Sequence, residues 1–175
     1  MDLKKISFNR ITVKSYSLWE DKWLLLTAGD YDTKKFNCMT ISWGSLGVMW
    51  NKPYIQVVVR PTRYTFQFIN EFPDFTVCAF PEKYHKVLQT LGSKSGRKID
   101  KIGHSGLTPF KPPMVAAPAY EEAELIFQCH KIYWQDLDPE HFLDPKSHAC
   151  YTNNDYHRSF YGEILAINGV DEYSA

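Results

Sequence analysis

The stretch FNCMTISWGSLGVMWNKPYIQVVVRPTRYT, residues 36–65, contains two β-type runs, a connection punctuated by glycine, and a basic turn. Over residues 54–60 the apolar side chains alternate with more polar ones, so that Ile55, Val57 and Val59 share one face. This period of two is typical of a strand that is buried on one side only. We therefore expect a half-buried strand here and take it as the centre of the fold.

The basic turn that follows predicts a binding site for an anion. Thr62 is a plausible N-cap for a helix over residues 62–70, and such a helix leaves backbone N–H groups free in its first turn. The turn also carries the guanidinium groups of Arg60 and Arg63 and a second hydroxyl on Thr65. Together these donors suit a phosphate monoester. An ordinary capped helix with two solvated arginines is the alternative that spacing leaves open.

The first run, residues 37–44, predicts a second strand whose two faces differ in chemistry. Trp43 lies on the apolar face, and Thr40 and Ser42 lie on the other. Hydroxyls and backbone groups at a strand edge, with an indole nearby, could receive a flat heteroaromatic ligand. A tryptophan that serves only the core or an interface is the competing interpretation.

Composition indicates one globular domain over residues 1–175 that needs no disulfide staples. Its 20 basic and 20 acidic residues balance, which argues against general binding to nucleic acid or to anionic membranes. The four cysteines are widely separated, and there is neither a signal peptide nor a long apolar run. We therefore expect reduced, mostly buried thiols in a cytoplasmic protein. The 11 Phe, 11 Tyr and 5 Trp exceed what a small barrel can hide, so a homodimer is expected.

The rest of the chain predicts a mainly β protein with a few short helices. The expected elements are a strand with a turn over 6–18, strands over 22–27, 75–80, 121–134 and 160–167, a turn at 28–30, and a helix over 82–91 that stops at Gly92. In the strand over 160–167, Tyr161, Glu163, Leu165 and Ile167 are expected on one face. Many strands separated by turn signals favour a barrel with helical plugs over a doubly wound fold.

The loop over residues 92–101, GSKSGRKIDK, carries four cations against one carboxylate. Its spacing does not match a P-loop, so we expect either a flexible wall that presents cations to an anionic ligand or a solvated loop. The only dense group of metal-type side chains, in residues 141–150, has no established metal spacing, so no metal site is predicted. Hydrolase and Rossmann motifs are absent from the sequence.

Four short segments occur in one order along the chain: Asn37-x-Met39-Thr40-x-Ser42-Trp43, Arg60-Pro61-Thr62-Arg63-Tyr64-Thr65, Ser95-Gly96-Arg97-x-x-Asp100-Lys101 and His157-Arg158-x-x-Tyr161-Gly162-Glu163-Ile164. In this combination the chain resembles the flavoredoxin branch of the flavin reductase-like family. The resemblance covers most of the chain. It implies a split β-barrel that binds FMN and forms a homodimer with the flavin near the interface.

The resemblance also implies a role for particular residues in holding FMN. It places the phosphate beside Arg60, Thr62, Arg63 and Thr65. It places the isoalloxazine and ribityl chain along Asn37, Met39, Thr40, Ser42 and Trp43, with Lys101 reaching in from the loop over 92–101. A cation near the N1/O2 edge of the ring would stabilise the anionic reduced flavin. No residue is predicted as a catalytic acid, base or nucleophile, because the flavin performs the electron chemistry.

The leading hypothesis is an FMN-dependent oxidoreductase that receives electrons from NAD(P)H or from a reduced protein carrier. Two features differ from the family pattern and leave the donor open: the connection over 46–52 holds the bulky Met49 and Trp50, and the chain ends soon after Ile164. A second hypothesis is an FMN-binding store or sensor without turnover. A third is a split-barrel interaction module that binds no flavin.

Overall fold

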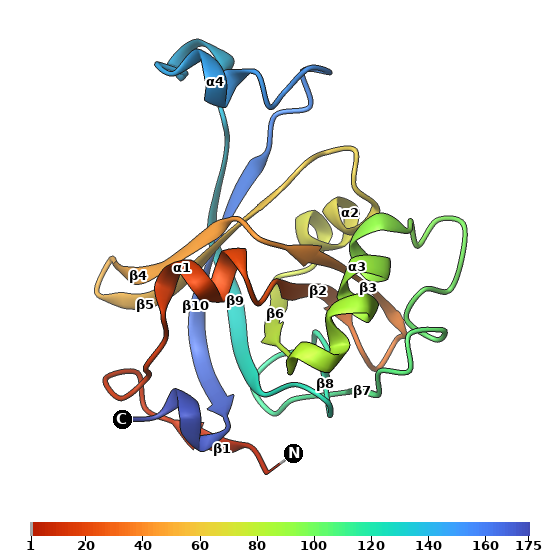
Figure 1. The fold of residues 1–175 in the computed structure, drawn as a ribbon, viewed down its shortest axis with the longest axis vertical. Coiled ribbons are helices and arrows are strands. Elements are labelled where there is room, and N and C mark those ends of the chain that lie inside the picture. The colour runs from red at the N-terminus through yellow and green to blue at the C-terminus, as the bar shows by residue number, and fades with distance from the viewer. Residues whose placement is uncertain (1) are drawn as a thin grey trace.

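In the computed structural model, which describes residues 2–175, one antiparallel sheet of eight strands forms the body of the protein (Figure 1). Seven strands follow the order β3-β2-β6-β9-β10-β5-β4, and β1 pairs with β10. The strands are β1 Lys4–Ile6, β2 Leu24–Asp30, β3 Lys35–Ile41, β4 Gly44–Met49, β5 Lys52–Val59, β6 Asp74–Ala79, β9 Leu125–Asp136 and β10 Arg158–Gly169. The short pair β7 Pro109–Phe110 and β8 Ala119–Tyr120 stands apart from this sheet.

Short helices lie around the sheet. They are α1 Ser15–Glu20, α2 Tyr64–Glu71, α3 His85–Ser93 and α4 Pro145–His148, with single 3₁₀ turns η1 Glu82–Tyr84, η2 Pro139–His141 and η3 Asp171–Tyr173. The mainly β fold with few short helices that the sequence predicted is thereby confirmed. No helix within residues 2–175 is long and apolar enough to cross a membrane.

The largest core cluster forms where the apolar faces of the curved sheet meet. Ile55, Val57 and Val59 of β5 are fully buried, as their alternation predicted, and they pack with Phe75 and Phe160 from neighbouring strands. A second cluster lies beneath α3 and includes Leu88, Leu91 and Tyr120. Burial of these side chains is what holds the helices against the sheet.

The cysteines follow the predicted pattern. Cys38, Cys78 and Cys129 are buried, Cys150 is exposed, and none forms a disulfide. Burial raises the pKa of Cys38 to about 11 and that of Cys78 to about 12, so these thiols stay protonated and unreactive near neutral pH.

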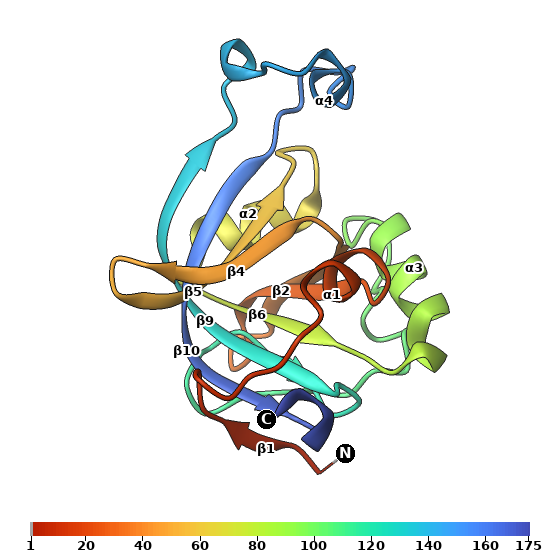
Figure 2. The same cartoon turned by 60° about the vertical axis from the view of Figure 1, so that its left-hand side comes forward.

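β9 and β10 are the two longest strands, and both extend beyond the rest of the sheet (Figures 1 and 2). The segment that joins their far ends, residues 137–157, carries η2 and α4 and is called the connecting arm below. Figure 2 shows the arm rising above α2 and the end of β5.

Several predicted boundaries were wrong. The chain does not turn at residues 28–30: β2 continues through Gly29, whose φ of 127° and missing Cβ allow Lys35 and Phe36 of β3 to approach closely. Residues 6–18 do not form one strand, since β1 ends at Ile6 and the helix α1 begins at Ser15 to bury Leu18 and Trp19.

Two further details differ from the sequence expectations. Gly92 lies inside α3, which ends one residue later. In β10, the register shifts between Ile164 and Ala166, so Ile167 returns to the core instead of sharing a face with Tyr161 and Glu163. A β-bulge of this kind inverts the alternation of side chains beyond it.

Candidate functional site

The predicted site residues meet in a groove bounded by β3, the start of α2 and the loop after α3. Two adjoining cavities of about 90 Å³ and about 180 Å³ form this groove, and both are lined by Met39 and Arg63. The smaller cavity, called the α2 cavity, is also lined by Asn37, Thr62, Thr65 and Lys101. The larger, called the Trp43 cavity, is also lined by Thr40, Ser42, Trp43 and Arg60. All ten residues proposed from the sequence therefore line one cavity or the other.

The first turn of α2 leaves donors free beside Arg63. Within residues 2–175, the backbone N–H groups of Tyr64 and Thr65 have no acceptor. The exposed guanidinium of Arg63 makes one long hydrogen bond, from Nη1 to the Gly92 carbonyl at 3.4 Å. Free backbone N–H groups at a helix start beside a nearly uncommitted guanidinium are suited to an anion.

The cap of α2 differs from the prediction. Arg63, not Thr62, occupies the N-cap position, and no side chain caps the helix. Thr62 instead donates its hydroxyl hydrogen to Asp155 Oδ2 of the connecting arm at 3.3 Å. Because no side chain caps the helix, the first-turn N–H groups of Tyr64 and Thr65, two residues that line the α2 cavity, keep no side-chain partner.

Several predicted hydroxyl and amide groups are occupied by structural hydrogen bonds. Thr65, which is buried, donates to the Cys38 carbonyl at 2.9 Å and accepts from Asn37 Nδ2 at 2.8 Å. Thr40 donates to the Leu88 carbonyl of α3. These contacts fix β3 against α2 and α3, so they shape the groove and leave fewer free donors in it.

Lys101 stabilises the end of α3. Its Nζ donates to the Leu91 carbonyl at 2.7 Å and to the Lys94 carbonyl at 3.2 Å, which satisfies carbonyl groups that the helix leaves open. Burial, reinforced by the charge of Arg63, lowers the pKa of Lys101 below its usual value. Lys101 lies in the α2 cavity with Arg63 and Thr65, so its position fits the phosphate end of a bound ligand better than the ring end.

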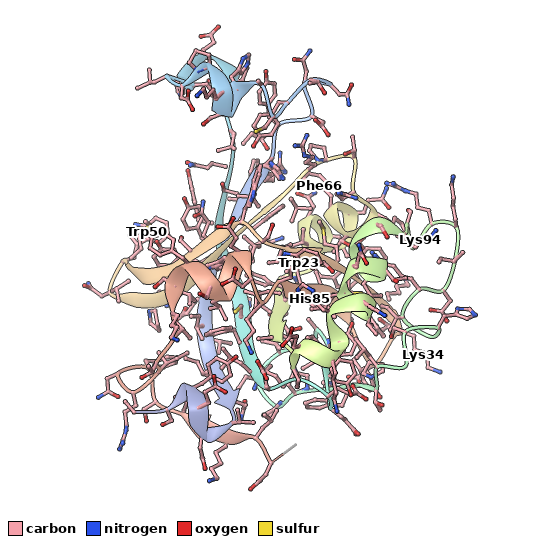
Figure 3. All side chains as sticks on the ribbon, viewed as in Figure 1. Trp23, Lys34, Trp50, Phe66, His85 and Lys94 are labelled. Carbon is pink, nitrogen blue, oxygen red and sulfur yellow. The ribbon has the colours of Figure 1, made fainter. Side chains whose placement is uncertain are left out.

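The loop after α3 closes one side of the α2 cavity. Lys94, labelled in Figure 3, follows α3 and lines the α2 cavity together with Tyr64 and Thr65 of α2. A Cβ added at Gly96 would lie 2.5 Å from Asn37 Oδ1, so only glycine allows the loop to come this close to β3. Arg97 stacks over the Tyr64 ring at 5.0 Å and donates to the Thr62 carbonyl at 3.2 Å. The loop is thus a wall of the groove, while the cationic groups of Arg97 and Lys101 donate to carbonyl groups of the protein.

His157 also lines the Trp43 cavity, although the sequence analysis named it only within a motif. Its ring lies 5.3 Å from the Trp43 ring, and its Nδ1 is hydrogen bonded to the Tyr151 hydroxyl at 2.8 Å. Burial, with the nearby charge of Arg60, lowers the pKa of His157 to about 4, so the imidazole is neutral near pH 7. Spacing could not reveal this residue, because the connecting arm brings it to Trp43 from more than a hundred positions away in the sequence.

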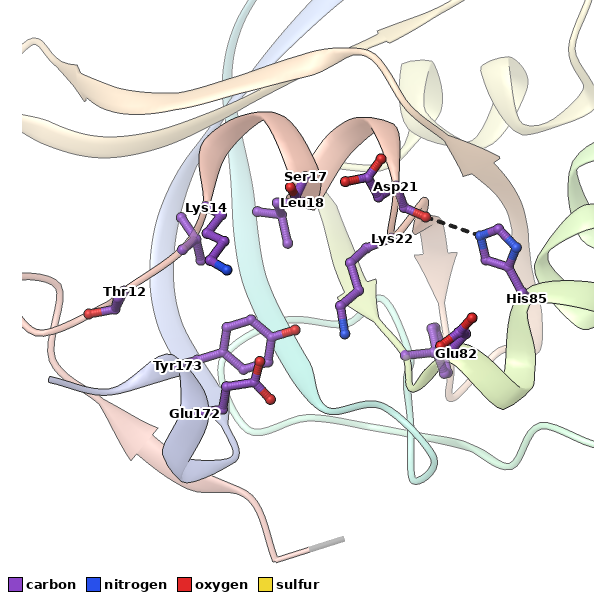
Figure 4. Close-up of a pocket in the computed structure, with 12 residues that line it drawn as sticks. Thr12, Lys14, Ser17, Leu18, Asp21, Lys22, Glu82, His85, Glu172 and Tyr173 are labelled. Atoms are coloured by element: carbon purple, nitrogen blue, oxygen red, sulfur yellow. Dashed lines mark hydrogen bonds between the residues drawn. The ribbon is translucent and has the colours of Figure 1, made fainter.

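A cavity of about 540 Å³ lies outside the predicted site, between α1, η1 and η3 (Figure 4). Its wall includes Lys22 and Tyr173, which both donate to Glu124 Oε1, at 2.7 Å and 2.6 Å. Ammonium and carboxylate groups both line it, and none of the predicted site residues contributes. Within residues 2–175, no group of three or more His, Cys, Asp or Glu side chains is arranged to hold a metal ion.

Comparison with known proteins identifies the family. The model of the flavin reductase-like domain matches residues 22–173, so the chain belongs to the flavin reductase-like family. No curated protein matches the chain.

Solved structures of similar fold include flavoredoxins and FMN-binding domains. The flavoredoxin of Methanosarcina acetivorans is 24% identical, with a TM-score of 0.65 over 97% of this chain and 74% of that one. The flavoredoxin of Desulfovibrio vulgaris (Miyazaki F) is 22% identical, with a TM-score of 0.67 over 97% and 78%. An FMN-binding domain of a flavin reductase-like enzyme from Shewanella baltica OS155 is 16% identical, with a TM-score of 0.68 over 96% and 77%. These likenesses confirm the split-barrel fold.

Proposed function

We propose that this protein binds FMN in the groove between β3 and α2 and acts as an oxidoreductase. The observation that carries the proposal is the set of free donors at the start of α2, namely the N–H groups of Tyr64 and Thr65 and the guanidinium of Arg63. This set suits one terminal phosphate monoester. Membership of the flavin reductase-like family supports the same ligand.

The rest of the groove fits the other parts of FMN. Met39 lines both cavities, which gives a ribityl chain a path from the α2 cavity to the Trp43 cavity. There the indole of Trp43, about half exposed, and the neutral imidazole of His157 offer flat surfaces for stacking on a ring. When bound, FMN would supply the electron chemistry, and these residues would hold and orient it.

In this proposal the electrons come from NAD(P)H or from a reduced protein carrier and leave to a small-molecule or protein acceptor. The working unit is a cytoplasmic homodimer, with a flavin near the interface. Among proteins of similar fold, one is an NADH:FAD oxidoreductase of Streptomyces globisporus C-1027, at 14% identity. An FMN store or sensor without turnover is the alternative function, and it differs from an enzyme only in its redox behaviour.

The first experiment identifies the flavin. The purified protein is expected to be yellow and to release FMN on denaturation, which chromatography against FMN and FAD standards detects. A site with one terminal phosphate position favours FMN, so FAD as the main species, or a colourless protein that does not respond to added FMN, would refute the proposal.

A second experiment separates an enzyme from a store. The FMN-loaded protein is mixed with NADH or NADPH without oxygen, and absorbance of the oxidised flavin near its visible maximum is followed. In an oxidoreductase that uses a nicotinamide donor, the flavin absorbance is expected to fall when the nucleotide is added and to return in air. A protein that bleaches with neither nucleotide, nor with a reduced flavodoxin- or ferredoxin-type carrier, is a store or sensor.

A further inference from the structure

The two arginines of the basic turn have different surroundings. Arg63 is exposed and nearly uncommitted, as described above. Arg60 is fastened to the connecting arm: its Nη1 donates to Asp155 Oδ1 at 2.5 Å, and its Nη2 donates to the Cys150 carbonyl at 2.9 Å. The Asp155 carboxylate therefore already accepts a hydrogen bond from Arg60, whose guanidinium the sequence analysis placed beside the phosphate.

The contacts of Arg60 continue through the arm to the Trp43 cavity. The guanidinium lies 4.8 Å from the centre of the Tyr151 ring, a cation–π distance. The Tyr151 hydroxyl is hydrogen bonded to His157 Nδ1, and the His157 ring lies against Trp43. Arg60 therefore lines the Trp43 cavity itself and also connects to Trp43 through two aromatic side chains of the arm.

The Arg60–Asp155 ion pair is sheltered from water. The side chains of Arg60 and Asp155 are 23% and 12% exposed, and Asp155 Oδ2 accepts a further hydrogen bond from Thr62. By contrast, most ion pairs on protein surfaces are well solvated and contribute little to the stability of the fold. The part of the arm that carries η2 and α4 projects beyond the sheet (Figure 2).

We propose that Arg60 is a positioning residue that fastens residues 150–157 of the connecting arm over the Trp43 cavity and so shapes the ring end of the flavin site. Arg63 is then the only one of the two arginines that serves the phosphate. This inference rests on the proposed function, and it assigns Arg60 to recognition of the ring instead of the phosphate.

The test compares binding of FMN and riboflavin, which differ only by the phosphate, to Arg60→Ala, Asp155→Asn and the double variant. Each single variant is expected to weaken both ligands by the same factor, about tenfold. The double variant is expected to bind FMN and riboflavin no more weakly than the single variant with the lower affinity, because both substitutions break the same Arg60–Asp155 contact. Arg158→Ala is the matched control: Arg158 also pairs with an aspartate, Asp136 at 2.7 Å, but lines neither cavity.

Hydrogen exchange tests the fastening itself without any ligand. The N–H groups of Cys150, Tyr151 and Asn154 form backbone hydrogen bonds within the arm. Their exchange is expected to accelerate in Arg60→Ala and to stay unchanged in Arg158→Ala. This readout works even if the wild-type protein binds no flavin, so failure of the proposed function and failure of this inference can be told apart.

Three results would overturn the inference. One is a loss of FMN affinity in Arg60→Ala at least tenfold greater than the loss for riboflavin, which would make Arg60 a phosphate ligand. Another is unchanged affinity for both ligands in a folded variant. The third is unchanged exchange of the three arm amides.

Discussion

At the scale of single residues, Arg63 gives the sharpest test of the phosphate site. A charge-assisted hydrogen bond from its guanidinium to a phosphate would contribute about 1.5–3 kcal/mol. Arg63→Ala is therefore expected to weaken FMN binding by about tenfold to a hundredfold and to leave riboflavin nearly unchanged. Titration by fluorescence quenching with both ligands measures the ratio. An unchanged FMN-to-riboflavin ratio would remove Arg63 from the phosphate site, and equal losses would indicate damage to the shape of the groove.

His157 predicts a pH dependence of stability. Its pKa is lowered from 6.5 to about 4 in the folded protein, so the unfolded chain binds the proton more readily between these values. Stability from this residue is complete above about pH 6.5 and is lost as the pH falls toward 4, with a slope of at most about 1.4 kcal/mol per pH unit. Urea denaturation of wild type and His157→Gln from pH 7.5 to 4 measures it.

In His157→Gln the loss of stability in this pH window is expected to be shallower than in the wild type. His141 provides the control, because its side chain is 82% exposed. His141→Gln should follow the wild-type curve, and identical curves for all three proteins would contradict the prediction.

At the scale of elements, the loop after α3 depends on the absence of a side chain at Gly96. In Gly96→Ala the new methyl group would meet Asn37 Oδ1, and Asn37 cannot retreat because it is buried and hydrogen bonded to Thr65. The loop must move away from β3, so FMN affinity is expected to fall about tenfold. Calorimetric titration measures the loss.

Gly47→Ala is the matched control for this substitution. A methyl group at Gly47 would meet only the Tyr54 side chain, at 3.0 Å, in the hairpin between β4 and β5. FMN affinity there should match the wild type. If Gly96→Ala also binds FMN normally, the loop is not a wall of the site.

The sequence predicted elements well where a single residue pattern decides the structure. The alternation of Ile55, Val57 and Val59 predicted the position of β5 correctly, because these three inward-facing side chains are apolar and buried while the residues between them are partly exposed. It did not locate the bulge in β10, because the shift at Ile164 to Ala166 depends on pairing with β9, more than thirty residues away. Gly29 was taken for a turn because glycine suits turns and also suits close approach of two strands.

For the candidate site, too, the sequence indicated what short motifs carry and missed what distant segments contribute. The ten residues proposed from the sequence line the two cavities, because the motifs that carry them adjoin α2 and β3. The sequence could not predict which side chains the site residues would contact. Asp155, Tyr151 and His157 come from the connecting arm, and only the folded chain brings them to Arg60 and Trp43.

At the scale of the whole molecule, an aromatic surface on the outer face of the sheet predicts association. Trp50 lies 5.6 Å from Tyr133 and 6.5 Å from Tyr161, and Tyr161 lies 5.7 Å from Tyr54. Figure 3 shows Trp50 at the tip of the hairpin between β4 and β5, where it is 55% exposed. Exposed aromatic groups of this kind often mark interfaces.

We therefore expect a homodimer in solution, with twice the chain mass of 20.4 kDa by light scattering at micromolar concentration. Trp50→Glu places a charge on this surface and should shift the protein toward monomer without loss of its far-ultraviolet circular dichroism. Lys34→Glu, at the turn between β2 and β3, is the control and should stay dimeric. A monomeric wild type would contradict the prediction.

The pairing of β10 has a consequence for how the chain folds. β10 follows all the other strands in the sequence, yet it pairs with β1, β5 and β9, so Lys4 must find Gly169 before the sheet is complete. Proteins dominated by such distant pairings fold slowly, in milliseconds to seconds. Until residues 158–169 leave the ribosome, β5 and β9 each have an unpaired edge. Val57 and Phe127 then also lack the apolar side chains of β10 that share their core cluster. The nascent chain is therefore prone to aggregation until β10 has been synthesised, and a chaperone that binds extended apolar segments would protect it during that interval.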